Sequence, residues 1–443
     1  MKVFAISLGC PKNTIDTEVA LGSLGSTNSG LKLTNNPQEA DLLIINTCGF
    51  IEEAVSESID TILAVAKGKT DRQVLVVMGC MVQRYGNDLK KELPEVDIFL
   101  GTGAPQSLAT LIEDHGAQHP VQSPTTRVLT TPPWRAYVKI SEGCSNRCTY
   151  CLIPMLRGNE TSRPVAEIVS EVSSLAIKGV KEITLVAQDL TAYRNGGKTL
   201  PDLLEALAGE TDLPWFRLLY LHPGKVNIRL LETIASNTSI CPYLDIPIQH
   251  ASTNILRSMG RRYDSKVLED LMSQISKLLS HAAVRTTVMV GFPGETEDDF
   301  KKLREFVEKW EFEHLGCFIY SDEKECMANK LPGKVSLETA MARKDEIMNI
   351  QAGISRAKNS GMVGRVEQVL VEGVSSETEL LLAGRTRHQA PEIDGIVYIN
   401  EGTAGCGEIV SVKITDSHIY DLVGKIVTVH GVTTPILPQP AEL

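Results

Sequence analysis

The sequence predicts an α/β protein of several domains: an N-terminal parallel-sheet α/β domain, a central partial (β/α) barrel and a small antiparallel β-barrel of the OB kind. Three observations predict this fold class. The chain has 443 residues, more than one ordinary domain holds. Apolar strand runs alternate with helical stretches up to about residue 360, as in βα units. After residue 363 short β-rich runs separated by glycines replace that pattern.

The first domain is expected over residues 1–115 and the second over 135–360. In the first, strands are predicted at Val3–Leu8, Asp41–Asn46 and Gln73–Met78. A linker, residues 116–134, is rich in Pro, Thr and Gln and marks the boundary. Six further βα units then indicate a parallel barrel, partial or closed. Their strands are predicted at Ala136–Ile140, Glu182–Ala187, Phe216–Leu221, Tyr243–Ile248, Thr286–Val290 and Leu315–Tyr320.

The small β-barrel is expected over residues 363–431, after a helix around 337–358. Its strands are predicted at Val366–Glu372, Glu379–Leu382, Ile396–Ile399, Glu408–Ile414 and Lys425–Val429. The tail Thr433–Leu443, with three prolines, is expected to be loose.

Composition limits the compartment and the partners. The chain is 42% hydrophobic and 22% charged, which is typical of a globular protein. No apolar run reaches the ~20 residues of a membrane span, and the N-terminus lacks a cleavage-site pattern, so a cytoplasmic protein without a membrane partner is predicted. Ten cysteines in a reducing compartment indicate metal or redox chemistry rather than disulfides. The net charge of −11 disfavours a surface that binds nucleic acid all over and favours basic partners.

Three cysteines lie close together in the second domain, where Cys144, Cys148 and Cys151 form a C-x3-C-x2-C motif. The motif follows a predicted strand, so it stands at the end of a barrel where chemistry is usually found. Three thiolates can hold three irons of a four-iron cluster and leave the fourth iron open to a small molecule. A zinc site normally needs a second Cys or His pair, and ferredoxins use a different spacing. The motif in this context therefore indicates a radical S-adenosylmethionine (SAM) enzyme.

Three other cysteines each follow a strand of the first domain, although they are far apart in the chain. Cys10, Cys48 and Cys80 occupy this same structural position. Parallel strands end at one edge of a sheet, so the three thiols can meet there. A lone cysteine after a strand is usually a small buried hydrophobe, but three in one position predict a second metal site. The remaining four cysteines lack metal spacing and are interpreted as packing residues.

With these motifs in view, nearly the whole chain resembles the methylthiotransferase family of radical SAM enzymes. The segments that carry the resemblance are Leu8–Asn13 with Asp16 and Glu18, Asn46–Cys48, Met78–Cys80, Gly143–Pro154 with Arg157 and Gly158, and Ser162–Pro164. The last domain resembles the TRAM domain. The resemblance implies two four-iron clusters, one on each cysteine trio. It also implies that the central cluster binds SAM and cleaves it reductively, and that the other supplies or carries sulfur. An external electron donor and a sulfur source are then needed.

The family has two main branches, which modify either an aspartate of small-ribosomal-subunit protein twelve or an adenosine of tRNA. The Cys10-Pro11-Lys12-Asn13 segment resembles the protein-modifying branch, because the tRNA branch tends to have Cys-Gln-Met-Asn. Segments 245–252, 390–395 and 420–424 resemble that branch too. His222 departs from the family, which usually has tyrosine before this proline, and so does the stretch 325–327.

Four residues outside the cysteines are candidates for SAM binding. Gln188 and Gln249 end strands that face the expected site, and each either contacts SAM or satisfies loop backbone groups. Gly291 and Pro293 belong to a turn between a strand and a helix, and the resemblance implies that its backbone lies near SAM.

Charge gives a separate indication of the substrate. Residues 363–431 contain five basic and ten acidic residues, a net charge of −5. A domain that grips RNA should be basic, so an acidic one suits a basic ribosomal protein. These acids can also be only a solvated face. Methylthiolation of tRNA, or a non-enzymatic iron–sulfur carrier, remain the alternatives to a protein-modifying enzyme.

Overall fold

The computed structural model describes residues 1–25, 30–114 and 127–427, and these described residues form two compact units that divide between Met348 and Asn349. The predicted loose tail and most of the predicted linker lie outside the described residues.

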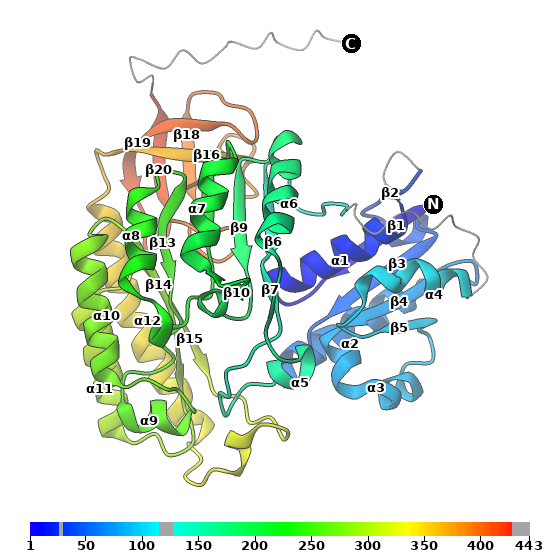
Figure 1. Cartoon of the computed structure of the whole chain (residues 1–443), viewed down its shortest axis with the longest axis horizontal. Coiled ribbons are helices and arrows are strands. Elements are labelled where there is room, and N and C mark those ends of the chain that lie inside the picture. Colours follow the sequence, from blue (N-terminus) through cyan, green and yellow to red (C-terminus); the bar gives the residue numbers. More distant parts are fainter. Residues whose placement is uncertain (26–29, 115–126, 428–443) are drawn as a thin grey trace. The chain divides into compact units, whose positions relative to one another are not determined.

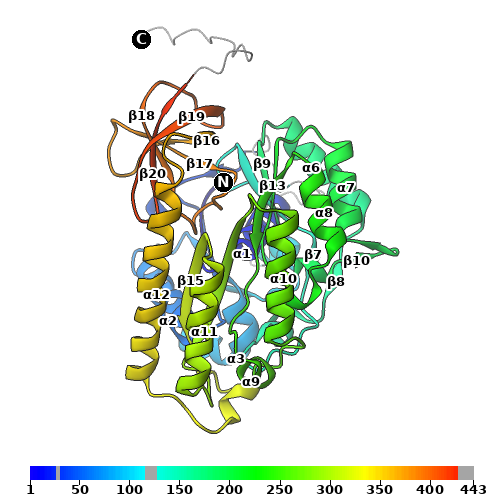
Figure 2. The same cartoon turned by 90° about the vertical axis from the view of Figure 1, so that its left-hand side faces the viewer.

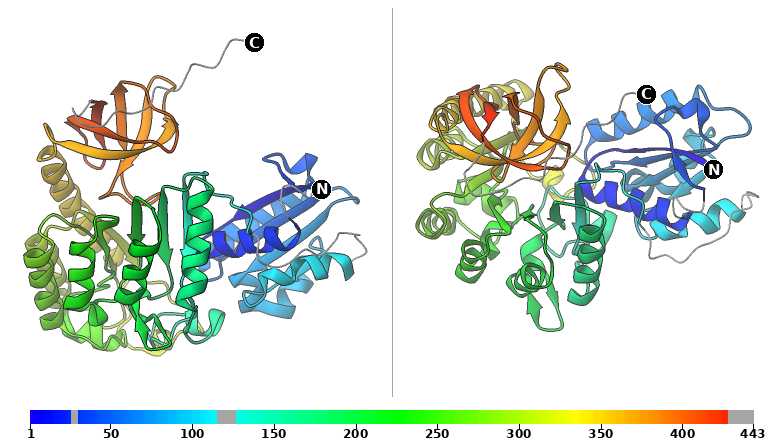
Figure 3. Two further views of the ribbon diagram at one scale, coloured as in Figure 1. Left: turned by 45° about the horizontal axis from the view of Figure 1, so that its top comes forward. Right: turned by 90° about the horizontal axis from the view of Figure 1, so that it is seen from above.

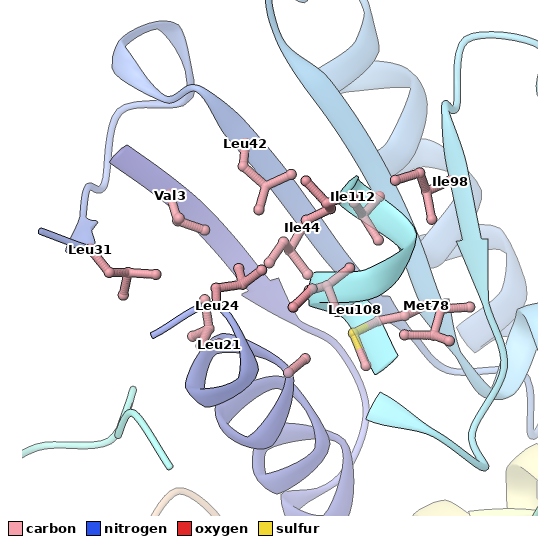
Figure 4. Close-up of a cluster of buried hydrophobic side chains, with 14 of the residues drawn as sticks. Val3, Leu21, Leu24, Leu31, Leu42, Ile44, Met78, Ile98, Leu108 and Ile112 are labelled. Carbon is pink, nitrogen blue, oxygen red and sulfur yellow. The ribbon is translucent and has the colours of Figure 1, made fainter. Parts of the chain in front are cut away.

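The first part of unit 1 is a five-stranded parallel sheet in the order β2-β1-β3-β4-β5 (Figure 1). Its central strand β3 is buried along its whole length, as expected when helices cover both faces. Figure 4 shows one face, where apolar side chains of α1 and α4 pack on β1, β3 and β4. The strands are β1 (Lys2–Ser7), β2 (Lys32–Leu33), β3 (Leu42–Thr47), β4 (Val74–Gly79) and β5 (Ile98–Leu100), and the helices α1 (Pro11–Ser23), α2 (Glu52–Ala66), α3 (Cys80–Glu92) and α4 (Leu108–Asp114).

The second part of unit 1 is a six-stranded parallel sheet in the order β15-β14-β13-β12-β9-β6, an open and therefore partial barrel. Figures 2 and 3 show its main helices side by side along the outer face. The strands are β6 (Arg135–Lys139), β9 (Glu182–Val186), β12 (Trp215–Leu218), β13 (Ile240–Asp245), β14 (Ala283–Val290) and β15 (His314–Ile319). The outer helices are α6 (Val165–Ile177), α7 (Leu200–Glu210), α8 (Ile228–Ser236), α10 (Ser265–Leu278) and α11 (Glu297–Trp310).

Shorter elements lie in the loops of this sheet. Two helices, α5 (Ile153–Arg157) and α9 (Thr253–Ser258), follow strands β7 and β13. Two-residue strands pair as β7 (Ser141–Glu142) with β8 (Thr161–Ser162) and β10 (Arg194–Asn195) with β11 (Lys198–Thr199). Short 3₁₀ helices occur at Leu190–Ala192, Pro223–Lys225 and Met327–Lys330 in this sheet, and at Pro37–Glu39 and Pro105–Ser107 in the five-stranded sheet's part of the chain.

Unit 2 contains a closed five-stranded barrel in the order β16-β17-β18-β20-β19, drawn in orange and red in Figure 3. The long helix α12 (Leu337–Ser360) begins in unit 1 and ends in unit 2. The strands are β16 (Val366–Val374), β17 (Leu382–Thr386), β18 (Val397–Glu401), β19 (Ile409–Ser417) and β20 (Leu422–Ile426).

This barrel differs from the sequence prediction in two details. It is not wholly antiparallel, because the hairpin of β19 and β20 brings β20 alongside β18 in the same direction and so closes the barrel. The strand predicted at Glu379–Leu382 is displaced, because a turn closed by the Ser375 N–H and the Leu381 carbonyl precedes β17. Leu380 is 89% exposed at this turn, so its apolar side chain was a misleading strand signal.

Candidate active site

The three cysteines of the first domain lie at one edge of the five-stranded sheet. Cys10 follows β1 and precedes α1, Cys48 directly follows β3, and Cys80 begins α3 directly after β4. Because β1, β3 and β4 are neighbouring parallel strands, their carboxyl ends bring the three thiols together. The approach is close: a Cβ added to Gly9 would lie 3.1 Å from the Cys48 sulfur, so only glycine fits beside it.

The pKa shifts of Cys48 and Cys80 agree with this close approach of the thiols. Burial, together with the like charges of Cys10 and Cys80, raises the pKa of Cys48 to about 11. Burial also raises the pKa of Cys80, while the cationic Arg157 opposes the shift. Thiols that resist ionisation in the bare protein become ligands when a metal compensates their charge.

The central trio lies on the single loop between β7 and α5. The loop is fixed by backbone hydrogen bonds from Cys144 N–H to the Gly158 carbonyl (3.0 Å) and from Cys151 N–H to the Cys148 carbonyl (3.2 Å). Burial raises the pKa of Cys151 to about 12, with Cys148 and Cys144 adding to the shift. All ten cysteines of the chain are free thiols.

Cys10 of the first trio and all three cysteines of the central trio line one cavity of about 330 Å³ within unit 1. Cys10 contributes from the first domain, and Cys144, Cys148 and Cys151 from the central loop. A larger hollow of about 520 Å³ beside α9, α10 and α11 is lined by none of the cysteines. A molecule in the first cavity therefore has access to both groups of thiols.

Two strand-end residues on the cavity wall adopt the left-handed backbone region, Tyr220 with φ of 67° and Gln249 with φ of 67°. Side chains other than glycine avoid this region, and such strain gathers at functional sites. Tyr220 is held by its own N–H, which donates to the Asp245 carboxylate (2.9 Å), and by its carbonyl, which accepts from Leu190 N–H.

A buried network of charges joins the two trios. The Arg157 guanidinium, at the end of the helix that follows Cys151, donates to Asn13 (2.6 Å), Asp16 (2.9 Å) and Glu142 (3.1 Å). Lys139 pairs with the same two carboxylates. Although burial opposes ionisation, Lys139 and Arg157 lower the pKa of Glu142 to about 2. Arg157 thus contacts residues of α1 and of the central loop at once.

Glu142 in turn orients Gln188, whose amide nitrogen donates to it at 3.1 Å. The next residue, Asp189, accepts hydrogen bonds from Asn146 (2.8 Å) and from Lys225 (2.7 Å). Burial opposes the ionisation of Asp189, but Lys225 holds its pKa below the usual value. The cavity wall therefore has fixed charges of both signs.

The donor atoms fit the groups that the motif predicts. Among the described residues, no three His, Cys, Asp or Glu side chains form a site for a single metal ion. Each trio is instead a set of three soft sulfur donors of the kind that iron–sulfur clusters use. Three polar atoms on the cavity wall, Gln188 Oε1, His222 Nδ1 and Arg261 Nε, are buried without a hydrogen-bond partner in the described part of the chain. Because buried polar atoms are normally satisfied, these three atoms are suited to a polar ligand in the cavity.

The predicted site residues separate into two groups. Gln188 and Gln249 line the cavity together with four of the six cysteines. Gly291 and Pro293, between β14 and α11, are not among its lining residues. Their neighbour Phe292 instead packs edge-on against the ring of Tyr150, which does line it.

The sequence interpretation missed several residues of this cavity: Lys12, Tyr150, Asp189, Tyr220 and Arg261. Lys12 and Tyr150 lie inside the cysteine motifs, so their position in the sequence could have indicated them as site residues. Asp189 and Tyr220 follow strands, and only their position at strand ends pointed to them.

Comparisons with known families match three successive segments. Residues 2–101 match uncharacterized protein family UPF0004, residues 138–307 match the radical SAM superfamily, and residues 363–427 match the TRAM domain. In overall structure the chain is similar to the radical SAM methyltransferase TsrM from Kitasatospora setae, with a TM-score of 0.54, 13% identity and 72% of each chain covered. At that identity the likeness shows the fold alone. Fold and cysteine loop together define a radical SAM enzyme, whose cofactors are SAM and an iron–sulfur cluster.

Curated relatives are similar over almost the whole chain. Ribosomal protein uS12 methylthiotransferase RimO from Trichlorobacter lovleyi is 46% identical, with 96% of this chain and 98% of the relative covered. The protein of the same name from Geobacter sulfurreducens is 45% identical, with 96% and 99% covered. The chain belongs to the family of ribosomal protein uS12 methylthiotransferases.

Proposed function

We propose that the protein adds a methylthio group to the β-carbon of an aspartate of ribosomal protein uS12. The observation that carries the proposal is the near full-length similarity to relatives named for this activity. Cys10 and the central trio line one cavity, which supports a reaction in which one site generates a radical and the other supplies sulfur.

We propose that each trio holds one four-iron cluster through its three thiolates. When bound, the central cluster and SAM supply the radical chemistry, and the cluster on Cys10, Cys48 and Cys80 supplies the sulfur group. The chain's own residues position these groups: Arg157 and Lys139 fix the carboxylates of Asp16 and Glu142, and Glu142 fixes Gln188. The cavity is lined mostly by partly buried side chains, so it stays open to a substrate from outside.

The charge of the last domain supports a basic protein substrate. Of its ten acidic residues, five have exposed side chains: Glu377, Glu379, Glu392, Glu401 and Asp416. Among its five basic residues only Arg365 and Lys413 are classed as exposed, and Arg385 is fully buried and paired with Glu372. The exposed surface of this domain is therefore acidic, which suits a basic ribosomal protein better than tRNA phosphates.

The described residues include no helix long and apolar enough to span a membrane. Because the substrate is a ribosomal protein, we place the enzyme in the cytoplasm. An external electron donor and a sulfur source complete the reaction.

The test is mass spectrometry after an anaerobic reaction of the reconstituted protein with SAM, a reductant and sulfide. Ribosomes and unmodified tRNA are offered in parallel. A methylthio mass gain on an aspartate of uS12 is the expected result. A methylthio mass gain on a tRNA adenosine instead would show that the proposed substrate is wrong. A protein that holds clusters but forms no deoxyadenosine from SAM would favour the iron–sulfur carrier.

A further inference from the structure

Lys12 is a buried cation on the wall of the shared cavity. It lies on α1, two residues after Cys10, and is only 7% exposed. Its ammonium group donates to the Ala187 carbonyl (3.3 Å) and stands 4.0 Å from the centroid of the Tyr220 ring. Ala187 is the residue before Gln188, so Lys12 bridges from the first domain to the barrel strand ends.

Lys12 differs from three other cations near the site, whether buried or partly exposed, in lacking a carboxylate partner among the described residues. Lys139 and Arg157 each pair with two carboxylates, and Lys225 pairs with Asp189. Among the residues that the structure describes, no carboxylate lies within ion-pair distance of Lys12. A buried ammonium group has three protons to donate, and a buried charge without a partner is costly. The site is therefore built to receive an acceptor from the cavity.

The Tyr220 ring beneath Lys12 is held in place by a strained backbone conformation. Tyr220 keeps a left-handed backbone through the hydrogen bond to Asp245, and this conformation sets its ring under the ammonium group. A cation over an aromatic face is fixed in direction without being neutralised. The ring thus positions the Lys12 ammonium group on the cavity wall and leaves it available to an anion.

A second cation, Arg261, lines the same cavity without a carboxylate partner in the described chain, and it needs to be distinguished from Lys12. Arg261 donates a hydrogen bond to the Tyr150 hydroxyl (2.6 Å), so it contacts the central cysteine loop, where SAM is expected. Lys12 comes from the first domain, next to Cys10. A substrate that receives a group carried there must approach Lys12 rather than Arg261.

We propose that Lys12 binds the carboxylate of the substrate aspartate and makes the enzyme selective for an acidic side chain. The inference rests on the proposed function and names a residue that recognises its substrate. The aspartate carboxylate supplies the negative charge that the protein itself does not provide, and it holds the β-carbon between the two groups of thiols.

The test is a double-mutant cycle on binding, measured without reductant so that no chemistry occurs. The reconstituted wild-type enzyme and the Lys12→Met variant are each titrated with uS12 carrying either the target aspartate or asparagine in its place. Methionine preserves the length of the side chain and removes the charge. We expect the wild type to bind the aspartate form about 30-fold more tightly than the asparagine form, and Lys12→Met to bind both equally.

Three controls separate the possible failures. Lys2→Met, at an exposed ion pair on β1, should behave as the wild type. Iron content and SAM affinity of Lys12→Met should match those of the wild type; a loss of iron would show that Lys12 compensates a cluster, and weaker SAM binding would assign it to SAM, and either result would overturn the inference. Lys12→Gln replaces the methionine variant if that one does not fold.

The outcome also distinguishes the inference from the proposed function. If the wild type does not modify or bind uS12, the proposed function fails and the inference fails with it. If the wild type modifies uS12 but Lys12→Met still prefers aspartate over asparagine, only the inference is wrong.

Discussion

The two cysteine trios are assembled in opposite structural ways. Cys144, Cys148 and Cys151 lie within eight residues on one loop, which its own backbone hydrogen bonds hold in shape. Cys10, Cys48 and Cys80 are spread over 71 residues, and only the pairing of β1, β3 and β4 brings them together. A local motif specifies the first site, and the topology of a sheet specifies the second. The two sites should therefore fail in different ways when the chain is changed.

The largest difference is expected when one thiolate of each trio is removed. Cys148→Ser should abolish the formation of deoxyadenosine from SAM, because the open iron is lost with its cluster. Cys48→Ser should retain deoxyadenosine formation and lose methylthio transfer. Chromatography of the nucleoside and iron analysis measure both effects, with the exposed Cys406 replaced by serine as the control. Deoxyadenosine from Cys148→Ser would refute the assignment of the central site.

A second change should affect both trios at once. Arg157→Gln leaves Asp16 and Glu142 buried without their guanidinium partner, which should lower the free energy of unfolding by about 3–5 kcal/mol. Arg229 is a matched control, because it also contacts two carboxylates but is 52% exposed. Arg229→Gln should change the urea midpoint little, since exposed pairs are screened by water. Equal effects of the two variants would show that the Arg157 network does not link the sites.

A third change should affect only the trio that the sheet assembles. Gly79 precedes Cys80 with φ of 101°, and an added Cβ would lie 2.2 Å from Asn46 Oδ1 and 2.7 Å from the Thr47 carbonyl. Gly79→Ala should cost about 3–4 kcal/mol from backbone strain and overlap together. Gly179 has a similar φ of 95° with nothing within 4 Å, so Gly179→Ala should cost only about 1–2 kcal/mol. Unfolding by urea tests stability, and iron analysis should show loss from Gly79→Ala alone.

The smallest effect is a pH dependence on the side of the central loop. Burial and the neighbouring Arg261 lower the pKa of His222 to about 4, below its value in the unfolded chain. Between pH 6.5 and 4 the unfolded state then binds the extra proton, so stability falls as pH falls, by about 1.4 kcal/mol per pH unit at most. His222→Tyr, which restores the residue usual in the family, should remove this contribution. The urea midpoints of the wild-type and His222→Tyr apoproteins are measured at pH 6.5 and 5. An equal decrease in the midpoint of both proteins between these pH values would contradict the prediction.

Sequence reasoning predicted most of the fold because the signals were regular. The strands predicted for both parallel sheets lie within a few residues of their expected positions, since buried strands such as β3 are continuously apolar. The short strand β5 was missed because Ile98–Leu100 is too brief to show a period. In the last barrel, the exposed Leu380 gave a false strand signal, and the parallel pair of β18 and β20 depends on long-range closure.

For the site, the sequence could indicate residues but not their partners. The cysteine positions relative to strands were readable, and Gln188 and Gln249 were predicted at strand ends. That Arg157 joins Asn13 and Asp16, more than 140 residues away, follows only from the folded contacts. Lys12 belongs to a motif that the sequence analysis noted. Its lack of a carboxylate partner, however, could be established only from the positions of the neighbouring described side chains.

The Arg157 network also bears on how such chains can be recombined. The family comparisons divide the molecule into separate segments, and residues 2–101 resemble an independent module. Yet Asn13 and Asp16 in that module share hydrogen bonds with Lys139 and Arg157 in the next. A hybrid that takes its first segment from a relative would replace the residues at positions 13 and 16, and Lys139 and Arg157 would then lack their partners unless the relative has the same residues there. Exchange between homologues should succeed only where these positions travel together, so the unit of inheritance is the pair of segments rather than either one.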